Sequence, residues 1–295
     1  MFTAPCSEKP ALVPGISAWA GLAPSLSRVA VYVLLTAITI TTIVPVLWMI
    51  ETSFKTQFEY LQNTWLWPTQ PTLDAYIGLF QQANFGRYFV NSVVVVVTSV
   101  FSILLVGSMA AYALSRYQFG GRHLILGYFL LGQMLPVTVL IVPLFLIVRD
   151  LGMLNTYAGL ALAHTAGALP LVIFLLYGFF LAIPHEIEDA ARIDGASEFD
   201  IYWRIILPLG APGLATAGIF QFLFIWNDLL LVLIIMQRDV MRTITLAVFQ
   251  AVGEYGTQVP SLFAGLTVSS IPVIVVYLLF TGQFHRGITA GALKG

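Results

Sequence analysis

The sequence predicts an all-α membrane protein with six transmembrane helices. Hydrophobic residues make up 59% of the 295 positions and charged residues only 9%, against roughly 25% in an ordinary soluble domain. Several apolar stretches reach the length of about 20 residues that a helix needs to cross a ~30 Å hydrocarbon core. These stretches are too long for the strands of a membrane barrel and lack the alternation of such strands. Because only helices and closed barrels satisfy their backbone groups in lipid, the spans are expected to be helical.

Six stretches that are poor in charged residues locate the predicted spans. All but the fifth lack Asp, Glu, Lys and Arg entirely, and the fifth is interrupted only by Asp228. The predicted spans are residues 29–50, 88–115, 123–148, 158–183, 213–236 and 262–281. Prolines occur inside several of these spans, and each one removes a backbone donor and tends to kink its helix. We therefore expect bent helices within one membrane domain at residues 29–282.

Both ends of the chain are predicted to lie outside the bilayer, on the cytoplasmic side. Residues 1–28 contain four prolines and no compact apolar stretch, so they predict a loosely ordered tail with a short amphipathic piece near residues 16–22, not a signal peptide. Residues 283–295 are expected to form a second tail. With the N-terminus inside, eight of the thirteen Lys and Arg residues fall on the cytoplasmic side, which is the bias that inner loops usually show.

One loop, residues 184–212, differs from a simple connector. It holds eight of the 27 charged residues and predicts two helices joined by a corner. Three acids follow Pro184 closely, and both proline and carboxylates favour a helix start. Gly195 is placed to end that helix in a left-handed conformation, and Ser197 to cap a second helix that stops near residues 207–208. The pattern fits either an amphipathic surface loop or a docking element for a cytoplasmic partner.

The composition and the missing motifs exclude several classes of function. A net charge of −1 provides no basic field for nucleic acid. The phosphate loop Gly-x4-Gly-Lys-Ser/Thr does not occur, so the chain is not expected to hydrolyse ATP by the usual route. His185-Glu186 begins like a zinc-protease motif, but residue 189 is Asp where the second His would stand. With one cysteine and no plausible nucleophile–base pair, we predict no metal site, no catalytic residue and no enzyme activity.

Asn227 and Asp228 are the most conspicuous polar residues inside a predicted span. A charge in the membrane costs roughly 2.5–3.5 kcal/mol on insertion scales, so it usually faces a cavity or a partner group. Two interpretations stay open: the pair lines a solute pathway, or it makes a structural hydrogen bond to a neighbouring helix. No Lys or Arg lies well inside a span, which favours a neutral sugar or polyol over an anionic solute.

The corner loop also carries a dense motif at fixed spacing. Its residues are Asp189, Ala190, Ala191, Asp194, Gly195, Ala196, Tyr202, Leu207, Pro208 and Leu209. This string resembles the hallmark loop of permease subunits of binding-protein-dependent ABC importers, where Glu usually stands at the position of Asp189. Four further stretches resemble the carbohydrate branch of that family, the maltose-permease-like second subunit. They are residues 111–117, 155–160, 226–228 and 287–295.

The resemblance implies a type I ABC-importer permease fold, spanning the cell (plasma or inner) membrane several times. The corner loop is then similar to a coupling helix that sits in a cleft of an ATPase. The implied partners are a dimer of cytoplasmic ATP-binding subunits, a second permease subunit of different sequence, an extracytoplasmic substrate-binding protein and membrane lipid. No cofactor is expected in this chain, because ATP and Mg²⁺ would bind the ATPase.

The resulting hypothesis is a permease subunit that couples ATP hydrolysis by a separate subunit to the translocation of a sugar or oligosaccharide by alternating access. One alternative is a proton-coupled secondary transporter, for which the single acid Asp228 is thin support. Among ABC importers, one for glycerol-phosphate, a polyamine or an amino acid is a further alternative. A membrane scaffold without transport is a third class, but it does not explain the corner loop.

Overall fold

The computed structural model describes residues 23–82, 84–254 and 258–292, and all regular structure in these residues is helical. The all-α prediction is therefore confirmed for this part of the chain. The elements are α1 (Ala23–Thr52), α2 (Gln57–Gln62), α3 (Asp74–Gln82), α4 (Phe85–Arg116), α5 (Arg122–Gln133), α6 (Val137–Asp150), α7 (Tyr157–Leu181), α8 (His185–Ile193), α9 (Glu198–Asp200), η1 (Ile201–Ile206), α10 (Leu207–Leu209), α11 (Ala211–Trp226), α12 (Leu230–Ile235), η2 (Asp239–Met241), α13 (Ile244–Glu254) and α14 (Val259–Ala292).

Among the described residues, four unbroken helices are long and apolar enough to cross a membrane: α1, α4, α7 and α14. Two bent pairs raise the number to six if each pair is one span. The first pair, α5 and α6, replaces the predicted third span and is bent by 109°. Its bend falls at Pro136, which stands just before α6 in an extended conformation. A proline predicts a kink at this position, but the observed bend is much larger than the kink that one proline causes in a continuous helix.

Residues 213–236, which were predicted to form the fifth span, do not form one continuous helix. Helix α11 ends at Trp226, the chain leaves the helix at Asn227 and Asp228, and α12 begins only at Leu230. At its other end α11 meets the helix that runs from α9 through η1 to α10, with a bend of 72°. That preceding helix continues through Pro208 to Leu209, slightly beyond the predicted stop.

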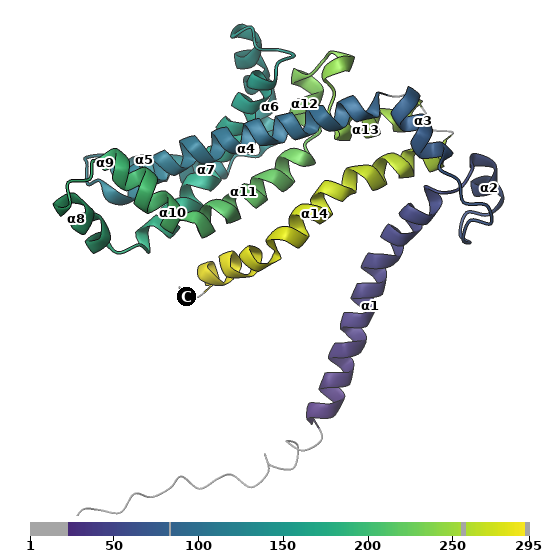
Figure 1. The fold of residues 1–295 in the computed structure, drawn as a ribbon, viewed down its shortest axis with the longest axis horizontal. Coiled ribbons are helices and arrows are strands. Elements are labelled where there is room, and N and C mark those ends of the chain that lie inside the picture. Colours follow the sequence, from purple (N-terminus) through teal and green to yellow (C-terminus); the bar gives the residue numbers. More distant parts are fainter. Residues whose placement is uncertain (1–22, 83, 255–257, 293–295) are drawn as a thin grey trace, which may run out of the picture.

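The core lies between α4 and α7, which run beside each other over much of their length, with α11 packed across them (Figure 1). Their fully buried side chains include Ile103, Leu160, Ile173 and Leu176. Gly107 permits this close packing, because a Cβ there would lie 2.7 Å from a methyl carbon of Val172. The α4–α7 pair therefore forms the closely packed body against which α5, α6, α11 and α12 lie.

Helix α1 stands apart from this body. It contacts α14 at one end and then diverges from the bundle (Figure 1). Its apolar side chains from Val29 to Leu47 are exposed. The predicted amphipathic piece at residues 16–22 lies outside the described residues. At the other terminus α14 remains helical to Ala292, so the backbone of the predicted tail at residues 283–295 is mostly helix.

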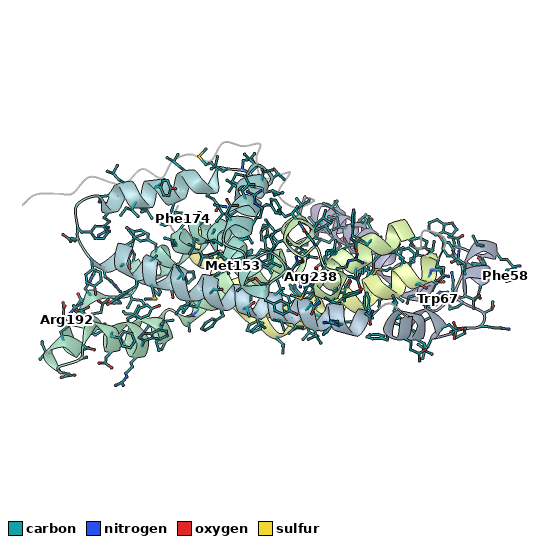
Figure 2. All side chains as sticks on the ribbon, turned by 90° about the horizontal axis from the view of Figure 1, so that it is seen from above. Phe58, Trp67, Met153, Phe174, Arg192 and Arg238 are labelled. Atoms are coloured by element: carbon teal, nitrogen blue, oxygen red, sulfur yellow. The ribbon has the colours of Figure 1, made fainter. Side chains whose placement is uncertain are left out.

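The two ends of the bundle differ in character. Figure 2 shows Arg192, in the corner loop, at one end of the long axis, and Phe58 and Trp67, in the segment after α1, at the other. The charged corner loop is thus separated by the length of the bundle from the aromatic segment around α2.

Candidate functional site

The corner loop has the backbone that its sequence predicts. Gly195 adopts φ +84° between the two helices, a conformation that costs glycine little and other residues much more. The hydroxyl of Ser197 accepts a hydrogen bond of 3.1 Å from the backbone N–H of Asp200 and donates one of 2.6 Å to its carboxylate. Both helix ends are therefore fixed by local contacts, and the corner is a defined turn between α8 and α9.

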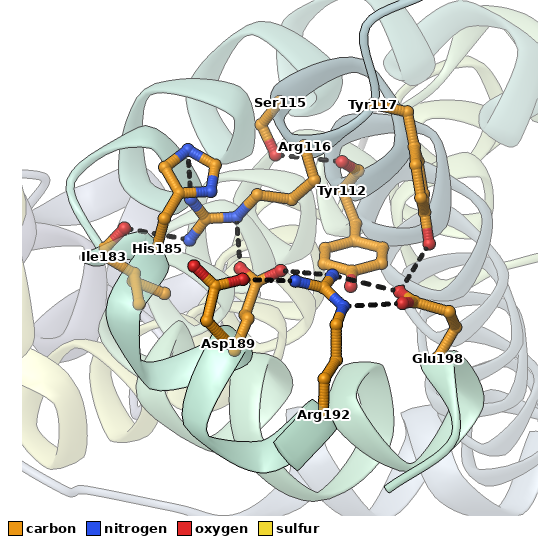
Figure 3. A network of polar contacts seen from close by, with 10 residues as sticks. Tyr112, Ser115, Arg116, Tyr117, Ile183, His185, Asp189, Arg192 and Glu198 are labelled. Carbon is orange, nitrogen blue, oxygen red and sulfur yellow. Dashed lines mark hydrogen bonds and ion pairs between the residues drawn. The ribbon is translucent and has the colours of Figure 1, made fainter. Parts of the chain in front are cut away.

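A buried ion pair ties the first corner helix to the end of α4. The Nε of Arg116 lies 2.6 Å from a carboxylate oxygen of Glu188, and the two side chains are only 2% and 1% exposed (Figure 3). Arg116 also donates a hydrogen bond of 2.9 Å to the backbone carbonyl of Ile183, and its other terminal nitrogen lies 3.3 Å from His185. One guanidinium thus holds both the entry to α8 and its first turn.

A second arginine clamps the corner from outside. Arg192 lies 2.9 Å from the carboxylate of Asp189 and 2.8 Å from that of Glu198, so it bridges α8 and α9 (Figure 3). Tyr117, which follows α4, donates a further hydrogen bond of 2.9 Å to Glu198. The hydrogen bond from Arg192 holds the pKa of Glu198 below its usual value, while the same contact raises the pKa of Arg192. The acid and the base of this clamp both stay charged at neutral pH.

The second corner helix is held through buried side chains. Ile201 and Ile206 are fully buried, and the Tyr202 hydroxyl lies 2.7 Å from the hydroxyl of Ser108 on α4. Tyr202 therefore anchors the helix and does not lie on its outer face. The outer side of the corner instead exposes large apolar side chains: Ile193, at the end of α8, is 87% exposed and Phe199, in α9, is 70% exposed. An exposed apolar surface on a rigid support is typical of a protein interaction site.

The predicted coupling residues divide between these two roles. Of the two buried residues, Tyr202 contacts Ser108 on α4, whereas the exposed residues lie on α8, at the corner and at the end of the second helix. Ala191 and Tyr202 are buried; Ala196 and Leu207 are half-buried; Asp189, Ala190, Asp194, Gly195, Pro208 and Leu209 are exposed. The residues that the sequence did not single out are Arg116 and Glu188, whose pairing depends on how α4 meets the loop.

The helix break is a second polar site. One oxygen of the Asp228 carboxylate accepts from the backbone N–H groups of Leu230 and Leu231, at 3.1 and 3.4 Å. The other oxygen lies 3.1 Å from Nε2 of His164 on α7. The opposite ring nitrogen of His164, Nδ1, lies 3.1 Å from the hydroxyl of Ser99 on α4. Asp228 thus makes a structural contact with a neighbouring helix. That it also contacts a solute stays a prediction.

Asn227 differs from its neighbour. Its side chain is exposed and its amide nitrogen donates a hydrogen bond of 2.8 Å to the backbone carbonyl of Leu223. Asn227 is therefore the residue of this pair that can meet another molecule, whereas both oxygens of Asp228 are occupied within the chain.

The serine, histidine and aspartate at the break do not form a hydrolytic site. Ser99 is fully buried, and His164 is only 7% exposed, so no ester or amide can reach the hydroxyl. The arrangement also offers only two metal-ligating side chains, and the described residues contain no group of three that could hold a metal ion. The contacts instead connect three helices, which is a structural and positioning role.

Comparisons with known proteins agree with the geometry. The family model "Binding-protein-dependent transport system inner membrane component" matches residues 103–290. The chain is 37% identical over 254 residues to the diacetylchitobiose uptake system permease protein NgcG of Streptomyces coelicolor, covering 85% of this chain and 84% of that protein. It is 39% identical over 256 residues to the trehalose transport system permease protein SugB of Mycobacterium tuberculosis, covering 86% and 93%.

A solved structure has the same fold. It is the crystal structure of a bacterial ABC transporter involved in the import of the acidic polysaccharide alginate, with a TM-score of 0.78 and 23% identity over 88% of this chain and 96% of that chain. Together with the family match over residues 103–290, the 37% and 39% identities are sufficient to assign the family. The chain belongs to the inner membrane components of binding-protein-dependent transport systems.

Proposed function

We propose that this chain is a permease subunit of an ATP-driven importer for a sugar or oligosaccharide. The observation that carries the proposal is the corner loop, a capped helix pair held by Arg116 and Glu188 and exposing an apolar face. Such a loop can transmit a rigid-body movement, whereas a flexible loop would absorb it. The sugar class is supported by relatives named for diacetylchitobiose and trehalose.

The exposed face of the loop is proposed to dock into a dimer of cytoplasmic ATP-binding subunits. Ile193 and Phe199 supply apolar contact area, and the Asp189 side chain, 65% exposed, supplies charge beside it. ATP and Mg²⁺ would bind in those subunits, because the sequence of this chain has no phosphate loop. This assignment puts the corner loop and both termini in the cytoplasm, in agreement with the bias of Lys and Arg.

Two further partners follow from the same proposal. A second permease subunit, more readily a different chain than a copy, would complete the pathway and cover apolar surface such as that of α1, whose side chains are exposed. A substrate-binding protein would deliver the solute at the opposite membrane surface. One similar structure is described as an alginate transporter in complex with an alginate pentasaccharide-bound periplasmic protein.

The solute pathway is proposed to pass the helix break. Asn227 is exposed there, and an amide can both donate to and accept from sugar hydroxyls. Asp228 would contribute by shaping the break, since both of its oxygens are occupied within the chain. A neutral solute fits this environment, because no lysine or arginine lies well inside a described span.

Reconstitution tests the proposal. The complex isolated through a tag on this chain is placed in liposomes, and uptake of labelled disaccharides and oligosaccharides is measured with and without ATP and binding protein. We expect uptake that requires both and that persists when a protonophore removes the proton gradient. The isolated chain should not hydrolyse ATP. Uptake driven by a proton gradient in the absence of ATP would instead establish the secondary-transporter alternative.

A further inference from the structure

The contacts at the helix break provide hydrogen-bond acceptors for the first backbone N–H groups of α12. The first N–H groups of α12 have no partner within their own helix, as at every helix start. Inside a membrane protein such groups are costly when they are unpaired, because lipid offers no hydrogen bonds. One oxygen of Asp228 accepts from Leu230 and Leu231 at 3.1 and 3.4 Å. The carboxylate is therefore the cap of α12.

His164 fixes the other oxygen of that cap. A carboxylate can only accept hydrogen bonds, so the 3.1 Å contact with Nε2 places a proton on this nitrogen. The ring is held on its far side by Ser99, 3.1 Å from Nδ1. Ser99 lies on α4 and His164 on α7, so the imidazole is oriented by the helix pair that forms the core. The chain of contacts runs from α4 through α7 to the break.

The other end of α12 is attached to the same body. The backbone N–H of Asn155, just before α7, donates a hydrogen bond of 2.9 Å to the carbonyl of Ile235. The side-chain oxygen of Asn155 accepts one of 2.8 Å from the backbone N–H of Arg238. Helix α12 has only six residues, which is too short to be stable alone. Its buried side chains Leu231, Val232 and Ile235 pack it beside α6 and α7. Its two ends are fixed in addition by these polar contacts, of which only the one at the break involves a titratable pair.

We propose that His164 is a positioning residue for transport: it holds the Asp228 carboxylate in the orientation that caps α12 and so fixes the shape of the break that presents Asn227. The inference rests on the proposed function, because it concerns the pathway of that same importer. His164 itself is buried and does not touch the solute. Its loss should slow translocation, which needs a defined break, and leave delivery of the solute by the binding protein unchanged.

Three variants test this assignment in the reconstituted complex. His164→Leu removes both ring contacts, His164→Gln keeps a side-chain N–H that can reach Asp228, and His123→Leu is the control at an exposed histidine on α5. We expect His164→Leu to lower the maximal uptake rate per inserted molecule about tenfold, as the loss of one charge-assisted hydrogen bond does. The half-saturating concentration of loaded binding protein should stay unchanged. The maximal uptake rate of His164→Gln should lie within about threefold of the wild-type rate, and that of His123→Leu should equal the wild-type rate.

A double-mutant cycle separates positioning from general stability. In an Asp228→Ala background, His164→Leu should cost no more than about twofold, because the group that it positions is gone. Equal losses for His164→Leu and His164→Gln, or the same tenfold loss in the Asp228→Ala background, would overturn the assignment. A loss of abundance with normal uptake per molecule would overturn it too.

Hydrogen–deuterium exchange gives a readout that does not depend on the solute. The amides of Leu230 and Leu231 should exchange faster in His164→Leu than in the wild type and in His123→Leu, while the amides of α4 should not change. This result would stand even if the wild type imported no sugar, so failure of the proposed function and failure of the positioning role are distinguishable. Unchanged exchange at these two amides would reject the role of His164 directly.

Discussion

Glu188 in the corner loop and Asp228 at the helix break are both sequestered carboxylates, but they have different kinds of partner. Glu188 is paired with Arg116 at 2.6 Å, and both side chains are almost fully buried. Asp228 is 19% exposed and is paired with His164 at 3.1 Å. Arginine keeps its charge under all ordinary conditions, whereas histidine can lose it near neutral pH.

The difference corresponds to the position of each pair. Arg116 is the last residue of α4, at the end of a span, where a permanent cation can be accommodated and also interacts favourably with the helix C-terminus. His164 lies within α7, where a permanent cation would cost several kcal/mol. The corner loop is thus fastened by fixed charges, and the break within a span by a group that can be neutral.

The largest expected effect comes from breaking the Arg116–Glu188 pair. Arg116→Met leaves the buried Glu188 carboxylate with only its 3.4 Å contact to Arg192, and removing one member of a buried pair typically costs about 3–5 kcal/mol. We expect a marked fall in thermal stability and the loss of ATPase stimulation by the loaded binding protein. The double variant Arg116→Met with Glu188→Leu should recover most of the thermal stability. A mild effect of the single variant, measured by thermal unfolding in detergent, would contradict the anchoring role.

Gly195→Val should have the second largest effect, and it should act on coupling without loss of insertion. No atom lies within 4 Å of a Cβ built at Gly195, so the only penalty is the left-handed backbone. That penalty is about 1–3 kcal/mol for a β-branched residue. Gly195→Asn is the matched control, because asparagine tolerates this conformation. ATP hydrolysis should continue in the valine variant while uptake falls; normal uptake in both variants would remove Gly195 from the coupling mechanism.

These two sites show what the sequence can and cannot predict. The corner was predictable because a glycine, a serine cap and nearby acids act within a few residues of one another. The Arg116 anchor was not, since its contacts with His185 and Ile183 lie more than sixty residues away along the chain. Asp228 was conspicuous as an acid in an apolar stretch, but its partner His164, and the Ser99 that contacts His164 in turn, are ordinary residues on other helices. Such pairings depend on how α4, α7 and α11 pack together.

A substitution on the outer side of the corner should have a smaller effect, which is limited to the binding of the ATP-binding subunits. Ile193→Ser changes a side chain that is 87% exposed, so the stability of the chain should not change. Its affinity for the ATP-binding subunits should fall about tenfold if Ile193 is a central contact. Tyr202→Phe is the comparison: it removes the hydroxyl contact with Ser108 and should lower stability by about 0.5–1.5 kcal/mol without affecting docking. Binding of the ATP-binding subunits can be measured by light scattering or on a surface that carries the immobilised permease. If Tyr202 and not Ile193 contacted the ATPase, Tyr202→Phe would weaken binding and Ile193→Ser would not.

Asp228→Asn should have the smallest effect, and it sharpens the comparison with Glu188. An asparagine oxygen can still cap Leu230 and Leu231, and its amide can donate to Nε2 while Nδ1 donates to Ser99, so every contact survives with the histidine tautomer reversed. Only the charge assistance is lost, which predicts a fall in ATP-driven uptake of about threefold. The rate of the remaining uptake should not change between about pH 6 and pH 8, because no proton is carried by this pair in the importer mechanism.

A proton-coupled carrier would behave otherwise: uphill uptake would vanish in Asp228→Asn while downhill exchange continued. Initial rates at constant ATP, measured across this pH range with and without a proton gradient, decide between the two.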